Sequence, residues 1–167
     1  MRISHLDEKT LIYIYRYRDF INIETKKISC EIQNGEFIRT RVKDLNSIQY
    51  KIDSYKKRYE NGEVPLNKCL NDLFGIRIVL SENIECEKIK NMIMVKFPQI
   101  KFLERNLEDK NYHALHLYFG KKDNYNFQWE LQIWDVKHKE QNYLSHHIYK
   151  QEYAKWEQEN KGGKENG

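Results

Sequence analysis

The sequence has few of the features that mark membrane, secreted or disulfide-rich proteins. No run approaches the roughly 20 apolar residues of a membrane span, and the N-terminus is too charged for a signal peptide. Its three cysteines, Cys30, Cys69 and Cys86, are far apart and odd in number, which disfavours both a disulfide framework and a zinc site. We therefore expect a cytoplasmic protein with free thiols and no membrane partner.

Familiar phosphate-binding loops are also missing. Neither G-x-x-x-x-G-K-[ST] nor G-x-G-x-x-G occurs, which excludes a Walker or Rossmann loop. The net charge of +4 fits a phosphate-bearing ligand without requiring one, because lysine is a common solubilising residue. No repeat, linker or low-complexity block divides the 167 residues. We expect a single domain over residues 1–160 and a disordered tail over 161–167.

The apolar pattern predicts an α+β fold in which helices flank a mixed β-sheet. Periods of three and four residues indicate helices over residues 6–23, 42–59, 84–97 and 136–158. Short apolar or alternating runs indicate strands over residues 76–80, 100–103, 113–119 and 127–134. The segment 28–41 is expected to be a connector with a turn at Asn34-Gly35, and 106–111 a polar loop.

A row of polar residues opens the second predicted helix. Lys43, Ser47 and Lys51 are four residues apart, so on a helix beginning near Val42 they would share one face. Ammonium groups, a hydroxyl and a helix N-terminus can together bind a polyphosphate. Taken alone, these residues are more typical of a solvated helix face.

Charged residues also stand in or beside two apolar strands. Asp72 precedes the strand at 76–80, and Arg77 lies inside it, where an arginine is costly unless it is paired or faces a cleft. Gly75 between them would allow close backbone approach. Period two puts Glu130 and Gln132 on one face of the last strand. If Asp72 and Glu130 converge, they suit Mg²⁺, which takes carboxylates and substrate phosphate oxygens. The structural alternatives are an Arg–carboxylate pair and a solvent-facing strand.

Tyr112 and His116 would share a face of one strand, separated by about 13 Å along the backbone. At a loop edge Tyr112 could stack on a base, and His116 could contact phosphate or hold a loop. Both residue types are also common at strand ends. The adjacent His146 and His147 have poor spacing for a metal, and we interpret them as structural or as supporting the residues that contact the ligand.

The order of these motifs is more specific than any one of them. The series Arg41-x-Lys43-x-x-x-Ser47-x-x-x-Lys51, Asp72-x-x-Gly75-x-Arg77, Tyr112-x-x-x-His116 and Glu130-x-Gln132 resembles the synthetase domain of the RelA/SpoT alarmone synthetases. His146-x-x-Tyr149-Lys150 is similar to that family's closing helix motif. The length resembles that of a small alarmone synthetase. No His-Asp dipeptide occurs, so the hydrolase half is expected to be missing.

The resemblance implies a nucleotidyltransferase-like synthetase domain that uses Mg²⁺ and two nucleotide substrates. It would transfer pyrophosphate from ATP to the 3′-hydroxyl of GDP or GTP, making (p)ppGpp and AMP. Carried over by motif, Arg41 and Arg77 would flank the adenine of ATP. The ATP phosphates would be held by Lys43, Ser47 and Lys51.

The remaining motifs are implied to bind the metal and the acceptor. Asp72 and Glu130 would bind Mg²⁺, and Glu130 would also be the base for the attacking hydroxyl. Tyr112 would stack on the acceptor guanine, with His116 and Gln132 supporting that pocket.

One segment departs from the family's pattern. The loop before the stacking tyrosine usually reads Pro-Lys-x-Asn-Gly-Tyr and here reads Leu107-Glu108-Asp109-Lys110-Asn111-Tyr112. An acidic pair therefore replaces a lysine that helps hold the acceptor's phosphates. Either Lys101, Arg105 or Lys110 compensates, or the acceptor lacks a free 5′-polyphosphate.

That departure leaves a second acceptor and a second protein class open. Toxic relatives transfer pyrophosphate to the 3′ end of tRNA, so tRNA stays an alternative to GDP and GTP. A catalytically silent module that binds nucleotide or RNA would keep the same fold. The sequence leaves open whether the chain forms a homo-oligomer and whether it has an antitoxin partner.

Overall fold

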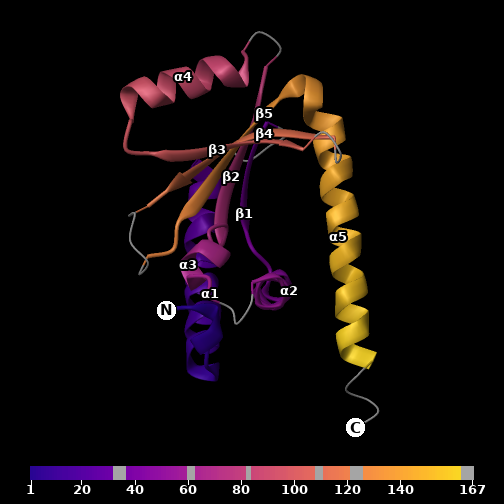
Figure 1. The fold of residues 1–167 in the computed structure, drawn as a ribbon. Helices are drawn as coiled ribbons and strands as arrows, with labels where there is room; N and C mark the ends of the chain where they lie inside the picture. Colours follow the sequence, from indigo (N-terminus) through magenta and orange to yellow (C-terminus); the bar gives the residue numbers. More distant parts are fainter. Residues whose placement is uncertain (32–36, 60–62, 82–83, 108–110, 121–125, 163–167) are drawn as a thin grey trace.

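A mixed five-stranded sheet with helices on both faces forms the body of the protein (Figure 1). The computed structural model describes residues 1–31, 37–59, 63–81, 84–107, 111–120 and 126–162. The elements in chain order are α1 (Glu8–Glu31), β1 (Ile38–Val42), α2 (Leu45–Arg58), α3 (Leu66–Cys69), β2 (Phe74–Leu80), α4 (Cys86–Lys96), β3 (Lys101–Leu107), β4 (Tyr112–Phe119), β5 (Trp129–Asp135) and α5 (Lys139–Gly162). Two short 3₁₀ helices cover Ile3–His5 and Val136–His138.

The strands lie in the order β1-β2-β5-β4-β3. The β2–β5 pair is parallel and the other three pairs are antiparallel. This register aligns polar residues in two rows across the sheet. One row runs through Arg41, Gly75, Glu130 and Tyr118, and the next through Arg39, Arg77, Gln132 and His116. Because side chains alternate along a strand, both rows project from one face.

The opposite face of the sheet carries an apolar core. Leu115, Leu117 and Ile133 are buried there, and Ile89 and Ile93 of α4 pack against them. A separate cluster joins α1, α2 and α3 through residues that include the fully buried Ile48 and Ile52. Each such side chain contributes about 1.5–3 kcal/mol relative to an exposed one. The second cluster fixes α2 against α1 and α3, and Lys51 of α2 reaches Asp72 beside β2.

The predicted α+β fold with a mixed sheet and flanking helices is confirmed, although several predicted boundaries were wrong. The sequence pattern missed β1, whose residues were assigned to a connector. It also ended α1 at residue 23, whereas the helix continues to Glu31 and its Ser29 hydroxyl lies 2.6 Å from that of Thr40 on β1. Contact with β1 therefore extends α1 through a polar stretch.

Two other boundary errors bear on the site and on the C-terminus. α2 begins at Leu45 rather than Val42, because Asp44 caps it by accepting the Ser47 backbone N–H at 2.7 Å. α5 runs from Lys139 to Gly162, whereas the sequence pattern predicts a helix over residues 136–158. The remaining tail residues, and the predicted turn at Asn34-Gly35, lie outside the described residues. Among the described helices, none is long and apolar enough to cross a membrane.

Candidate active site

Asp72 forms ion pairs with three cationic side chains, just before the start of β2. Its Oδ2 lies 2.7 Å from Lys43 Nζ and 3.4 Å from Arg41 Nη2, and its Oδ1 lies 2.9 Å from Lys51 Nζ. Burial alone would raise the pKa of Asp72, but Lys51, Lys43 and Arg41 hold it well below its ordinary value. The carboxylate is therefore ionised, and two elements, β1 and α2, are tied to it.

The two lysines respond to this environment in opposite directions. Burial lowers the pKa of Lys43, although Asp72 opposes the change. For Lys51 burial also acts to lower the pKa, but the attraction of Asp72 outweighs it and the pKa is raised. Lys51 is thus the more firmly charged of the pair.

The predicted ladder of Lys43, Ser47 and Lys51 on one helix face was wrong in part. Lys43 lies before α2, so only Ser47 and Lys51 are on the helix. Both lysines nevertheless reach Asp72. The Ser47 hydroxyl donates to Asp44 Oδ2 at 2.8 Å, which places it in the helix cap rather than beside the lysines. The role predicted for Ser47 toward ATP phosphate stays a prediction.

Glu130 lies on β5 at the centre of a hydrogen-bond network and is only 3 % exposed. Its Oε1 is 2.6 Å from His116 Nδ1 and accepts the Tyr118 hydroxyl at 3.1 Å. Its Oε2 accepts from Gln132 Nε2 at 2.8 Å. Burial alone would raise the pKa of Glu130, but the hydrogen bond and charge of His116, together with Arg41, lower it to about 2. Glu130 is therefore ionised at neutral pH.

Arg41 joins the two carboxylates. Its Nη2 lies 3.4 Å from Asp72 Oδ2 and 3.5 Å from Glu130 Oε2. The arginine side chain packs over Gly75, where an added Cβ would lie 3.5 Å from Arg41 Nε. Asp72 and Glu130 thus both contact one guanidinium group, which meets the condition that the sequence analysis set for a shared Mg²⁺ site.

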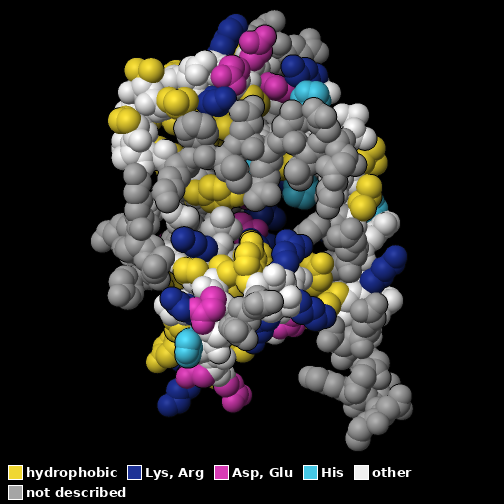
Figure 2. Space-filling view, in the orientation of Figure 1, with side chains coloured by type: hydrophobic (Ala, Val, Ile, Leu, Met, Phe, Trp, Pro, Cys, Tyr) yellow, Lys and Arg dark blue, Asp and Glu magenta, His cyan; other side chains and the backbone are white. Residues whose placement is uncertain are grey.

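Figure 2 shows a recess near the middle of one side of the molecule, with Lys or Arg, acidic and His side chains close to it. The described residues contain no cluster of three or more His, Cys, Asp or Glu that could hold a metal by themselves. Two ionised carboxylates facing one cation do fit Mg²⁺, which usually binds one or two carboxylates and completes its shell with phosphate oxygens and water.

Arg77 lies in the next row of the same sheet face and has no carboxylate partner among the residues that the structure describes. Gln132 Oε1 accepts from Arg77 Nε at 3.2 Å and from Nη2 at 3.1 Å. The guanidinium carbon lies 3.9 Å from the centroid of the Trp134 ring, and Nη2 lies 2.9 Å from His146 Nε2. The alternative of an Arg–carboxylate pair is therefore wrong. The cost of burying the Arg77 charge is offset by the cation–π contact with Trp134 and by hydrogen bonds to neutral acceptors.

Tyr112 is the first residue of β4, as expected at a loop edge, but its side chain is buried, and its role as a base platform stays a prediction. Only 7 % of it is exposed, and its hydroxyl lies 2.9 Å from His116 Nε2. Its ring meets those of Trp134 and His146 edge to face, with centroids 6.2 and 5.7 Å apart. The long side chain follows the strand, so Tyr112 and His116 touch although their backbones are four residues apart. Burial raises the pKa of Tyr112 to about 12, so the hydroxyl stays protonated.

Comparison with known proteins identifies the family. Residues 40–154 match the model for the region found in RelA / SpoT proteins, which is more than half of the chain. The chain belongs to the RelA/SpoT family. No curated protein matches.

Solved structures give more distant likenesses to this RelA/SpoT chain. Small alarmone synthetase 1 from Bacillus subtilis is 18% identical with a TM-score of 0.47, over 87% of this chain and 80% of that one. A GTP pyrophosphokinase family protein from Streptococcus pneumoniae is 18% identical with a TM-score of 0.48, over 86% and 76%. Small alarmone synthetase 2 from Bacillus subtilis is 19% identical with a TM-score of 0.44, over 86% and 80%. The family assignment rests on the family model.

The segment where this RelA/SpoT chain departs from its family's pattern is described only in part. Leu107 ends β3, and Tyr112 begins β4 after Asn111, which has a positive φ of 47°. Residues 108–110 lie outside the described residues. Lys101 is the first residue of β3 and pairs with Tyr118, but its predicted contact with the acceptor stays a prediction.

Sequence reasoning missed three side chains on this RelA/SpoT site. Trp134 and Tyr118 follow the period-two pattern of Glu130 and His116, so extending that pattern by one residue pair would have placed them on the same face. For His146 the sequence indicated a structural or supporting role, because its spacing suits no metal, but not which residue it contacts. Its partner Arg77 is distant in sequence, and no local pattern signals that contact.

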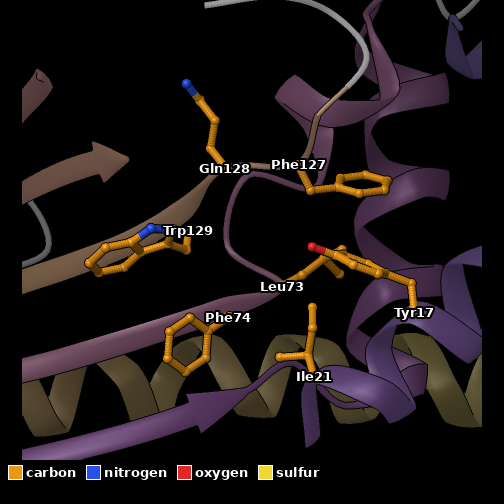
Figure 3. A pocket seen from close by; sticks show the side chains of 7 residues that line it. All are labelled: Tyr17, Ile21, Leu73, Phe74, Phe127, Gln128 and Trp129. Carbon is orange, nitrogen blue, oxygen red and sulfur yellow. The ribbon is translucent and has the colours of Figure 1, made fainter. Parts of the chain in front are cut away.

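The cavities next to α1 contain none of the predicted site residues. One of about 120 Å³ is lined by Tyr17, Ile21, Leu73, Phe74, Phe127, Gln128 and Trp129 (Figure 3). Tyr17 and Phe127 stack with ring centroids 5.6 Å apart and also line a neighbouring hollow of about 390 Å³. These cavities are mostly apolar and lack the charged groups that phosphate binding needs.

Proposed function

We propose that this chain transfers pyrophosphate from ATP to the 3′-hydroxyl of GDP or GTP, in a reaction that requires Mg²⁺. The observation that carries the proposal is the convergence of two ionised carboxylates, Asp72 and Glu130, on one cationic group within a chain of the RelA/SpoT family. Two further cations, Lys43 and Lys51, stand beside them. The cations outnumber the carboxylates, so the site favours a polyphosphate.

Each side chain has a role that follows from its chemistry. Asp72 and Glu130 would hold Mg²⁺, which when bound neutralises charge on phosphate oxygens. Lys43 and Lys51 would bind the ATP phosphates, because their ammonium groups are charged, partly buried and fixed by Asp72. Arg41 would turn toward the nucleotide when the carboxylates have another cation to bind.

The base-binding roles fall on the rest of the polar face. Arg77 offers a planar guanidinium backed by Trp134, a group on which adenine can stack. Tyr112 is the proposed acceptor platform, with His116 fixing its hydroxyl and Gln132 linking Glu130 to Arg77. Since Tyr112 is buried, one of its ring neighbours must move before a guanine can stack on it.

The transfer forms one bond and breaks one. The acceptor 3′-oxygen attacks the β-phosphorus of ATP, and the bond between that phosphorus and the α–β bridging oxygen breaks, so AMP leaves. The proton of the 3′-hydroxyl passes to Glu130, whose lowered pKa keeps it ionised before the reaction. Most of the rate enhancement in such reactions comes from positioning and charge neutralisation.

Incubation with γ-³²P-labelled ATP and Mg²⁺ tests the proposal, with GDP, GTP and deacylated tRNA offered in parallel. We expect label on GDP or GTP together with release of AMP. Label on tRNA alone would show that tRNA, and not GDP or GTP, is the acceptor. No transfer to any acceptor would indicate a catalytically silent nucleotide-binding module. Omitting Mg²⁺ should abolish transfer.

Glu130→Gln should reduce transfer by at least about 100-fold, because an amide neither accepts the proton nor binds the metal well. The nearly isosteric change should leave the circular dichroism spectrum unchanged. Glu140→Gln, an exposed position at the start of α5, is the matched control and should keep full activity. Near-normal turnover by Glu130→Gln would remove Glu130 from the mechanism.

A further inference from the structure

α5 runs beside the sheet (Figure 1) and contacts β4. Asn142, Tyr143 and His146 share one face of this helix, since they are three and four residues apart. Asn142 bonds the backbone of His113 on β4, and Tyr143 meets the Trp134 ring of β5 with centroids 5.2 Å apart. This turn of α5 is therefore fixed to both strands that carry the site.

His146 is the residue on this face that contacts both proposed nucleotide-binding groups. Its Nε2 lies 2.9 Å from Arg77 Nη2, on the proposed ATP side. Its ring meets Tyr112, on the proposed acceptor side, edge to face with centroids 5.7 Å apart. The same ring stacks on Trp134 at 5.7 Å, and Trp134 in turn supports Arg77.

His146 accepts the hydrogen bond from Arg77 as a neutral imidazole. Burial lowers the pKa of His146 to about 3, and the charges of Arg77 and Arg41 act in the same direction. The nitrogen that faces Arg77 therefore carries a lone pair at neutral pH, because a guanidinium can only donate. One imidazole thus supplies an acceptor atom on one side and a ring edge or face on the other.

We infer that His146 is a positioning residue for both substrates: its Nε2 sets the direction of Arg77, and its ring holds Tyr112. The inference rests on the proposed function, because it assigns Arg77 to ATP and Tyr112 to the acceptor. The two contacts use different parts of the imidazole, so two substitutions can separate them.

His146→Phe keeps a ring and removes the acceptor atom. We expect the KM for ATP to rise about tenfold, since a hydrogen bond to a charged group is lost, with little change in kcat or in the acceptor KM. His146→Gln keeps an acceptor atom near the position of Nε2 and removes the ring. We expect an almost normal KM for ATP. The KM for the acceptor should rise about threefold, because one aromatic contact with Tyr112 is lost.

The adjacent His147 supplies the matched control, because it is exposed on the same helix. His147→Phe and His147→Gln should leave both KM values within about twofold of the original protein. Calorimetric binding of a non-hydrolysable ATP analogue should repeat the ATP pattern without turnover. Thermal unfolding of each variant should show that the fold is kept.

The outcomes separate this inference from the proposed function. If the original protein binds the ATP analogue and His146→Phe binds it equally well, His146 does not position Arg77 and the inference fails while the proposed function stands. If both His146 variants raise both KM values alike, the residue is merely structural and the inference fails. If the original protein binds no ATP analogue, the proposed function fails and the inference with it.

Discussion

Arg41 has two competing sets of partners, and this competition is the main residue-scale feature of the site. Its Nη2 lies within 3.5 Å of an oxygen of Asp72 and of Glu130. A guanidinium there neutralises two buried carboxylates that would otherwise repel each other. A divalent cation needs the same oxygens. Arg41, which is proposed to flank adenine, therefore also occupies the carboxylate oxygens that would bind the metal.

Arg41→Gln should strengthen metal binding in the absence of nucleotide. Removing one positive charge between the carboxylates should raise the affinity for Mn²⁺, used as a paramagnetic substitute for Mg²⁺, by about tenfold or more. The same change should weaken binding of a non-hydrolysable ATP analogue. Electron paramagnetic resonance measures the free Mn²⁺.

Arg39→Gln is the control for Arg41→Gln. It removes the same charge from the same strand, but Arg39 is exposed. Its Mn²⁺ affinity should stay within about twofold of the original protein because screening weakens exposed charges. An unchanged affinity in Arg41→Gln would show that Arg41 does not compete with the metal.

The sequence was a good guide to which residues form the site and a poor guide to how they touch. Order and residue type identified Asp72, Glu130 and the cations around them. Spacing alone could not show that Lys43 and Lys51 approach Asp72 from different elements. Nor could it show that Tyr112 is buried, because its burial depends on α5, which lies about 30 residues further along the chain.

At the scale of elements, Asn142 fastens α5 to the sheet. β5 pairs with β4 only from Leu115 onward, so His113 lies beyond the last paired residue of β4 on that side. Asn142 is fully buried; its Oδ1 accepts the His113 N–H at 2.9 Å and its Nδ2 donates to the His113 carbonyl at 2.7 Å. One side chain thus satisfies two backbone groups that would lack strand partners.

Asn142→Leu should destabilise the protein strongly despite its similar size. Both backbone groups of His113 would lose their partner in a buried site, which costs about 3 kcal/mol. Urea unfolding should show this loss in the free energy of unfolding. Gln151→Leu, an exposed change on the same helix, should alter it by less than about 0.5 kcal/mol. Equal stability of both variants would contradict the role of Asn142.

The elements that the sequence failed to predict are those defined by tertiary partners. β1 has the sequence Ile-Arg-Thr-Arg-Val. Its two arginines face the polar site, so the segment lacks the apolar run by which the other strands were predicted. The polar second half of α1 forms a helix because it packs against that strand. By contrast, β2 and β5 were predicted because their apolar residues face the α4 core.

At the scale of the whole molecule, the protein combines apolar cores with buried ionised carboxylates. Apolar residues fill the α4 side of the sheet and the space among α1, α2 and α3. Asp72 and Glu130 lie on the remaining face and are less than 10 % exposed. Such groups favour folding only while they are ionised and paired. The free energy of unfolding should therefore fall more at acidic pH than it would if all the charged groups were exposed.

The direction of this dependence follows from Glu130. Its pKa falls from an ordinary value of 4.5 to about 2 in the folded protein, so the unfolded chain binds its proton first as the pH drops. The stabilisation by Glu130 is complete above pH 4.5 and is lost as the pH falls toward 2. The shift corresponds to about 3 kcal/mol. Asp72, whose pKa is also lowered, acts in the same direction at still lower pH.

Comparing the original protein with Glu130→Gln isolates this contribution. The glutamine variant cannot gain a proton at position 130, so the free energy of unfolding should fall less steeply between pH 5 and pH 2.5 than in the original protein. Urea titrations at intervals across that range measure the difference, and both proteins share every other titrating group. Parallel curves would mean that Glu130 ionises equally readily in the folded and unfolded chain. That result would contradict the network in which His116 and Arg41 hold it ionised.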